Sequence, residues 1–119
     1  MNKSKIVVTG GAGFIGTNFL HALREKYNDA EIVSVDIRKP TYPVSGVKYD
    51  LCDVRDEEKL SSVLEGSSKI FHLAALIGTH ESIEKPYASF ETNVQGTINI
   101  LEHARTHDTE VFVAGMPGI

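Results

Sequence analysis

A glycine-rich turn directly after a short apolar run is the feature that most constrains the fold of this chain. The run is Ile6-Val7-Val8, and the turn is Thr9-Gly10-Gly11-Ala12-Gly13-Phe14-Ile15-Gly16. Apolar residues resume after the turn at helical spacing, so the pattern predicts a strand, a tight turn and the start of a helix. Because glycine has no Cβ, it tolerates positive φ and lets another group approach the backbone closely.

The start of the predicted helix is suited to binding phosphate. The first amides of a helix have no intrahelical partner and lie at the positive end of its dipole. A pyrophosphate is therefore the natural ligand, while Gly16 would let the helix pack close to the strand. The glycines fit two registers, Gly11-x-Gly13-x-x-Gly16 and Gly10-x-x-Gly13-x-x-Gly16. Either register alone also fits a purely structural turn.

A carboxylate at the end of a second predicted strand makes a dinucleotide the more specific interpretation. The segment 31–35 predicts a strand that ends at Asp36, about 20 residues after Gly16. In dinucleotide-binding folds, a carboxylate there accepts hydrogen bonds from the adenosine ribose hydroxyls. Arg38 suggests a clamp for the 2′-phosphate of NADP, but Asp36 would repel that phosphate. The two residues together favour NAD.

The composition suits one globular domain and excludes several classes of partner. The chain has 119 residues, 41% of them apolar, and a formal net charge of −4. Its charges are interspersed, so no basic surface for nucleic acid is expected. No apolar run approaches the ~20 residues of a membrane span, and the residues before the first strand do not lead us to expect a secretory signal. Cys52 is the only cysteine, so we expect a buried thiol in a reducing, cytoplasmic setting.

Three helices are predicted from helical spacing and from capping residues. Apolar residues of the first helix should form one buried face: Ile15, Phe19, Leu20 and Leu23. The second helix should begin after Asp56 as N-cap and stop at Gly66. The third and longest should begin at Pro86 and place Gly96 close to the sheet. An apolar stripe marks this helix: Phe90, Val94, Ile98, Leu101 and Ala104.

Strands alternate with these helices. Beyond the first two, strands are expected at 47–51, 69–76 and 110–114, and the apolar run 69–76 is typical of a parallel strand covered on both faces. Alternation predicts an α/β fold with a doubly wound parallel sheet of the Rossmann type, with about five strands in the order 3-2-1-4-5. The ligand crevice should lie at the carboxyl ends of strands one and four, where the order reverses.

These residues resemble the extended short-chain dehydrogenase/reductase family, the NAD-dependent nucleotide-sugar epimerases and dehydratases. Thr9-Gly10-x-x-Gly13-x-x-Gly16 is similar to the family's cofactor turn, and Asp50-Leu51-x-Asp53-Val54-Arg55-Asp56 to the segment that flanks the adenine. Phe71-His72-Leu73-Ala74-Ala75 is similar to its fourth strand, and Thr92-Asn93-Val94-x-Gly96-Thr97 to its next helix. The resemblance implies NAD as the cofactor and a nucleotide sugar as the substrate of the intact enzyme.

The expected NAD contacts come from the turn, the two acidic segments, the end of the fourth strand and the third helix. They are Gly10, Gly13, Phe14, Ile15, Gly16, Asp36, Ile37, Asp53, Val54, Leu73, Ala74, Ala75 and Thr92. Asn93 is characteristic of this helix in the family, which favours a role in the architecture of the site. Its alternative role is a hydrogen bond to its own helix or to a neighbouring loop.

The resemblance does not extend to the catalytic residues. In the family, a Ser or Thr after the fifth strand and a Tyr-x-x-x-Lys perform the acid/base chemistry. Met116 aligns with the hydroxyl residue, and none of the four tyrosines has a lysine four positions later. A thioether cannot donate a hydrogen bond, so no catalytic residue is assigned.

We therefore expect residues 1–119 to form an incomplete NAD-binding domain that is inactive alone, with the catalytic and substrate-binding part absent. Two alternatives stay open, a noncatalytic nucleotide-sensing or partner-binding module and a reductase of a nonsugar substrate. An exposed edge at the fifth strand would favour a homo-oligomer.

The five histidines do not predict a metal site, because none has ligand spacing with Cys52 or a set of carboxylates. His72 lies inside the fourth predicted strand and is expected to be a core histidine with satisfied hydrogen bonds. His80 follows that strand in a loop, where a contact with ligand phosphate or sugar is the alternative to a purely structural role. His103 and His107 are expected at a solvated helix end.

Overall fold

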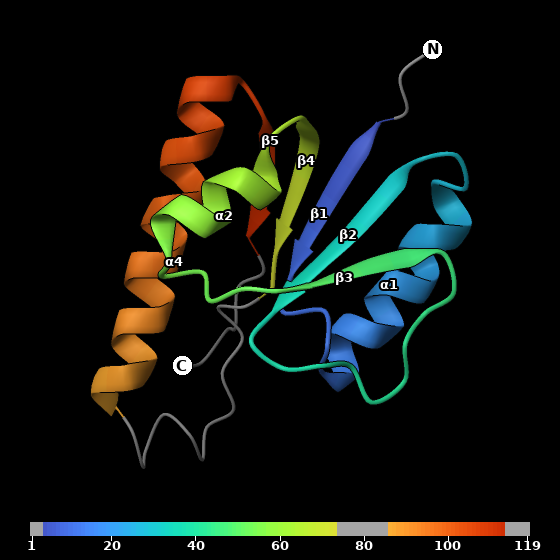
Figure 1. Cartoon of the computed structure of the whole chain (residues 1–119), viewed down its shortest axis with the longest axis horizontal. Helices are drawn as coiled ribbons and strands as arrows, with labels where there is room; N and C mark the ends of the chain where they lie inside the picture. Colours follow the sequence, from blue (N-terminus) through green and yellow to red (C-terminus); the bar gives the residue numbers. More distant parts are fainter. Residues whose placement is uncertain (1–3, 74–85, 114–119) are drawn as a thin grey trace.

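Strands and helices alternate along the chain in the computed structural model, which describes residues 4–73 and 86–113, with side chains for 4–73 and 94–113 (Figure 1). The elements in chain order are β1 (Lys5–Thr9), α1 (Phe14–Lys26), β2 (Glu31–Asp36), β3 (Val47–Leu51), α2 (Glu57–Leu64), β4 (Ser67–His72), α4 (Pro86–His107) and β5 (Glu110–Val113). No helix in these ranges is both long enough and apolar enough to span a membrane.

The predicted strand order is confirmed. Five parallel strands pair in the order β3-β2-β1-β4-β5, so the direction of strand addition reverses between β1 and β4. Helix α1 covers one face of the sheet, and α2 and α4 cover the other (Figure 1). In such folds ligands bind beyond the carboxyl ends of the strands where the order reverses.

Two apolar clusters fill the spaces between the sheet and its helices. Successive residues of β1 point to opposite faces, so Val7 joins the cluster under α2 and α4, while Ile6 and Val8 join the cluster under α1. All three β1 side chains are at most 1% exposed. Burial on both faces explains why the central strand is a continuous apolar run.

The glycine turn is built from close backbone contacts. Gly10 has a φ of 79° and donates its N–H to the Val35 carbonyl at 2.7 Å. A Cβ at Gly16 would collide with the backbone of Gly10 and Gly11, and a Cβ at Gly11 would collide with the Ser34 hydroxyl. The beginning of α1 can therefore lie directly against the end of β1 only because these positions carry no side chain.

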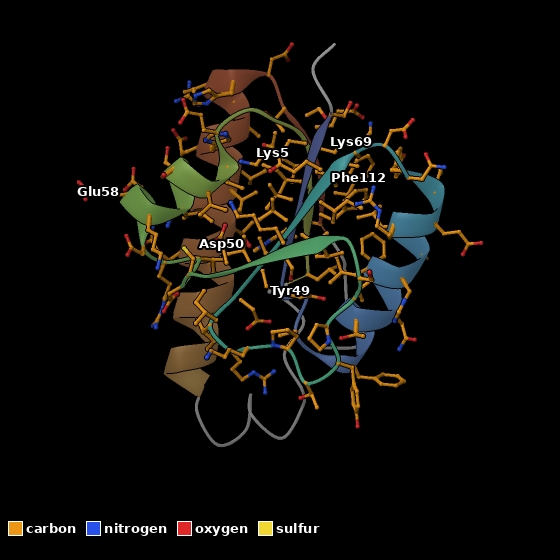
Figure 2. All side chains as sticks on the ribbon, turned by 45° about the vertical axis from the view of Figure 1, so that its right-hand side comes forward. Lys5, Tyr49, Asp50, Glu58, Lys69 and Phe112 are labelled. Carbon is orange, nitrogen blue, oxygen red and sulfur yellow. The ribbon has the colours of Figure 1, made fainter. Side chains whose placement is uncertain are left out.

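The ends of α2 were well indicated by the sequence. The Asp56 side chain accepts a hydrogen bond from the Lys59 amide at 3.2 Å, which confirms it as the N-cap. Gly66 has a φ of 81°, the left-handed conformation that suits a residue just beyond a helix end. Lys5, labelled in Figure 2, donates to the Val63 and Glu65 carbonyls at 2.7 and 2.9 Å, and so ties β1 to the end of α2.

The structure corrects two of the predicted apolar faces. Ile15 was expected on the buried face of α1, but it is 56% exposed, and Gly16 lies on that face instead. On α4 the predicted stripe is exposed by 40–48% at Val94, Ile98 and Leu101. Gly96, Asn99, Ile100 and His103 are buried instead. Helical spacing therefore found the apolar stripe of α4 but not the face that packs against the rest of the chain.

The observed bounds of β4 and β5 differ from the predicted ones. β4 begins two residues earlier than predicted and ends at His72, where the Leu73 amide still donates to the Thr9 carbonyl at 3.0 Å. β5 covers 110–113. The predicted continuations of these strands, 74–76 and residue 114, lie outside the described residues.

Candidate functional site

The first turn of α1 has the features of a phosphate site. Gly13 is the N-cap, with φ −80° and ψ −179°, a conformation open to any residue. Apart from Gly13 itself and its two chain neighbours, no described residue has an atom within 4 Å of the position that a Cβ of Gly13 would take. The amides of Phe14 and Ile15 donate to no other residue that the structure describes. Open space beside unpaired helix amides fits a diphosphate, because the amides can donate to its oxygens.

Asp36 joins the glycine turn to the end of β2. Its Oδ2 accepts a hydrogen bond from the Ala12 amide at 3.0 Å, and its Oδ1 accepts one from the Arg38 amide at 3.1 Å. Its backbone carbonyl accepts from the Cys52 amide at 2.9 Å. A carboxylate offers about four acceptor sites, so two remain for other donors such as ribose hydroxyls. The side chain is thus held in place while part of its acceptor capacity stays open.

Asp53 and Arg55 form an ion pair in the loop between β3 and α2. The Arg55 Nη2 donates to Asp53 Oδ2 at 2.7 Å, and the Arg55 amide donates to Oδ1 at 2.9 Å. These hydrogen bonds, above all those of the guanidinium, lower the pKa of Asp53. The carboxylate is therefore ionised at neutral pH and acts as an acceptor.

Val54, the next expected contact, is only 5% exposed and belongs to the cluster under α2 and α4. Its side chain packs into the core, so the backbone is what it offers to a ligand. The Val54 carbonyl accepts a hydrogen bond from Asn99 Nδ2 at 2.9 Å. Asn99 was not among the predicted site residues, although a polar residue at i+3 from Gly96, on the same side of a helix, was an available signal.

His72 links three elements at the carboxyl end of β4. Its Nδ1 lies 2.7 Å from Thr9 Oγ1 on β1, and its Nε2 lies 3.1 Å from Thr97 Oγ1 on α4. The side chain is fully buried, and burial lowers its pKa to about 4. The prediction of a core histidine with satisfied hydrogen bonds is confirmed. This neutral imidazole holds the ends of β1 and β4 and one turn of α4 together.

The other expected contacts are less well defined. Phe14 is 84% exposed and Ile37 68% exposed, so both present apolar surface beside the turn and beside Asp36. Leu73 packs against the cluster under α1. Ala74 and Ala75 lie outside the described residues, as do His80 and Met116. Thr92 and Asn93 lie within α4, but their side chains are outside the described part.

His103 corrects one expectation for the end of α4. It was expected to be solvated, but it is 7% exposed, and its ring stacks on that of His107 with centroids 4.0 Å apart. Burial is the main cause of the lowered pKa of His103. Among the described side chains, those of residues 4–73 and 94–113, no group of three or more His, Cys, Asp or Glu is arranged to hold a metal ion.

Comparison with known proteins places this geometry in context. Residues 6–115 match the sequence model of a family described as NAD dependent epimerase/dehydratase. A relative from Staphylococcus epidermidis, named uncharacterized epimerase/dehydratase, is 32% identical in an alignment of 118 positions that covers 96% of this chain and 37% of that protein. The chain thus spans little more than a third of the length of that relative.

Two solved structures illustrate the range of similar proteins. A Thermus thermophilus UDP-glucose 4-epimerase in complex with NAD has a TM-score of 0.78 and 30% identity, over 90% of this chain and 36% of that one. An L-threonine dehydrogenase from Clostridium difficile has a TM-score of 0.83 and 26% identity, over 95% of this chain and 36% of that one.

Because His72 is buried in its neutral form, the folded chain should become less stable as the pH falls. Its folded pKa of about 4 lies below the ordinary value of 6.5, so the unfolded chain binds more protons between these values. The free energy of unfolding should therefore fall by about 3 kcal/mol from His72 alone as the pH drops from 6.5 to 4. Urea denaturation at several pH values measures this slope.

The variant His72→Asn should lose that part of the slope, whatever its stability at neutral pH. The control His21→Asn, at an exposed position on α1, retains His72 and should keep the slope. An unchanged slope in His72→Asn would show that the imidazole is not the cause.

Proposed function

The chain belongs to the NAD-dependent epimerase/dehydratase family, and from that premise we propose that it holds the adenosine and diphosphate half of NAD. The site lies at the carboxyl ends of β1 and β2, around the first turn of α1. The amides of that turn would bind the diphosphate, Asp36 the adenosine ribose, and Asp53 and Val54 the adenine.

The observation that carries the proposal is the open space at Gly13. Gly11 and Gly16 are needed by the fold, because a Cβ at either would collide with the chain itself. At Gly13 neither the backbone angles nor the neighbouring residues require glycine. Glycine is also a favoured N-cap residue, and a ligand that approaches the backbone there gives a further reason for the missing side chain. The adjacent amides, which donate to no described residue, favour an anion.

Asp36 is suited to the ribose because it is already oriented by two amides. Its remaining acceptor sites would receive the 2′- and 3′-hydroxyl protons of the adenosine ribose. The same negative charge would repel the 2′-phosphate of NADP, so the site should prefer NAD. Ile37 would contact the adenosine through its exposed side chain.

The intact enzyme is proposed to act on a nucleotide sugar, as the name of the similar UDP-glucose 4-epimerase suggests. NAD would supply hydride transfer at a sugar hydroxyl, while the present residues bind and orient it. The likeness to an L-threonine dehydrogenase supports a nonsugar alcohol as the second candidate. The 119 residues contain no Tyr-x-x-x-Lys, so we propose that they bind NAD without turning over either substrate. A noncatalytic nucleotide-sensing module makes the same binding prediction.

Calorimetric titration of the chain with NAD, ADP-ribose and NADP tests the proposal. ADP-ribose should bind about as well as NAD, because the assigned contacts lie in the part that both ligands share. NADP should bind at least about tenfold more weakly, since the charge of Asp36 opposes its phosphate. Absence of binding by both NAD and ADP-ribose would contradict the proposed site.

The variant Asp36→Ala should lower the affinity for NAD by about tenfold to a hundredfold, because hydrogen bonds to a charged acceptor contribute about 1.5–3 kcal/mol. The matched control Asp29→Ala removes an exposed carboxylate at the other end of α1 and should leave affinity unchanged. Thermal unfolding checks that Asp36→Ala still folds, since it also loses the bond from Ala12.

We also propose that the chain self-associates through apolar surface on α4 and β5. The exposed side chains are Val94, Ile98 and Leu101 on α4 and Val113 on β5, each 40–49% exposed. Phe112 of β5 stacks on Phe71 and so lies on the α1 face of the sheet. Light scattering should give a mass above that of one chain, and Ile98→Glu should lower it because a charge would be buried in the contact. Lys59→Glu, at an exposed position on α2, is the control. A monomeric mass for the unaltered chain would contradict this proposal.

A further inference from the structure

Asn99 is a buried polar residue on α4 that contacts the loop between β3 and α2. It is 7% exposed, and its Nδ2 donates to the Val54 carbonyl at 2.9 Å. Its Oδ1 accepts from Gln95 Nε2 at 3.0 Å, one turn earlier on the same helix. The second bond fixes the orientation of the amide, so that its donor faces Val54. A buried carbonyl that loses such a donor costs about 1–3 kcal/mol.

Gly96 brings α4 and this loop close enough for that bond. A Cβ at Gly96 would lie 2.5 Å from Val54 Cγ2 and 3.2 Å from Val54 Cβ. The sequence suggested that Gly96 allows close approach to the sheet, but the contact is with the loop that follows β3. One turn of α4 therefore fixes both the side chain and the carbonyl of Val54.

Val54 stands next to the carboxylate proposed to recognise adenine. Asp53 is an ionised acceptor oriented by Arg55. The Val54 amide donates to no other residue in the described part of the chain. An acceptor and a free donor on adjacent residues can pair with the amino group and a ring nitrogen on the edge of adenine. Hypoxanthine has a carbonyl oxygen in place of that amino group, which the carboxylate would repel.

We propose that Asn99 is a positioning residue for adenine recognition, because it holds the Val54 backbone in the orientation that sets the donor beside the Asp53 carboxylate. This inference rests on the proposed function, since it concerns the adenine end of the same NAD site. Asn99 does not contact the nucleotide in this scheme and acts only through Val54. Its effect should therefore be greatest on the choice between purine bases.

The test compares ADP-ribose with its hypoxanthine counterpart by calorimetry. The unaltered chain should prefer ADP-ribose. In Asn99→Leu, which has a similar shape but no donor, ADP-ribose should bind about tenfold more weakly. The affinity for the hypoxanthine compound should change little, so the preference for adenine over hypoxanthine should also fall about tenfold. A merely structural role would weaken both ligands equally or neither.

Gly96→Ala provides a second variant, because its added methyl would displace Val54 while the Asn99 amide is kept. Gly96→Ala should also lower the preference for adenine over hypoxanthine. If Asn99→Leu does not fold, Gly96→Ala tests the positioning of Val54 in its place. The matched control is His103→Leu, one turn further along α4, since His103 is also buried and has no hydrogen bond to the loop. The control should keep the preference within about twofold.

The outcomes separate the two proposals. Failure of the unaltered chain to bind ADP-ribose would contradict the proposed function and this inference together. If the unaltered chain binds ADP-ribose and folded Asn99→Leu keeps the same preference for adenine over hypoxanthine, the role of Asn99 is contradicted but the NAD site is not. If Asn99→Leu does not fold, the same preference in folded Gly96→Ala has the same meaning.

Discussion

The contact of Gly16 with the backbone of Gly10 and Gly11 is the constraint on which the rest of the site depends. A Cβ at Gly16 would meet backbone atoms, which cannot move aside without displacing β1 or α1. Only with this contact does α1 begin directly beyond the carboxyl end of β1. The amides of its first turn, which donate to none of the residues that the structure describes, then lie at the point where the strand order reverses. An anionic ligand is best accommodated there in such a sheet.

Three polar side chains join the elements around this point. Asp36 ties β2 to the glycine turn, His72 ties β1 and β4 to α4, and Asn99 ties α4 to the loop after β3. His72 and Asn99 are at least nine-tenths buried, so water cannot readily replace their partners and each bond is costly to lose. The chain therefore orients the proposed contacts before a nucleotide binds. The energy of binding need not be spent on ordering them.

The strand order and the glycine turn could be predicted because they depend on local patterns. Apolar periodicity and right-handed crossovers leave few topologies, and the glycine pattern that marks the turn lies within eight consecutive residues. The partners of His72 and Asn99 in other parts of the fold could not be predicted, because they are 25 to 63 residues away in sequence. The exposure of the apolar stripe of α4 is a second feature that local sequence patterns could not predict. Helical spacing identifies an apolar face, but tertiary contacts decide that Gly96 and Asn99 pack inward instead.

The central claim is that the missing side chain of Gly13 makes room for a ligand, whereas the missing side chain of Gly16 allows α1 to pack against the end of β1. NAD affinity and the free energy of unfolding, measured together on Gly13→Ala and Gly16→Ala, test it most directly. Gly13→Ala should lower the free energy of unfolding by no more than about 1 kcal/mol, the loss expected when alanine replaces glycine at an N-cap. Its NAD affinity should fall at least about tenfold, because the methyl group takes the space of the diphosphate. Gly16→Ala should be strongly destabilised. A stable Gly13→Ala that binds NAD as well as the unaltered chain would contradict the claim.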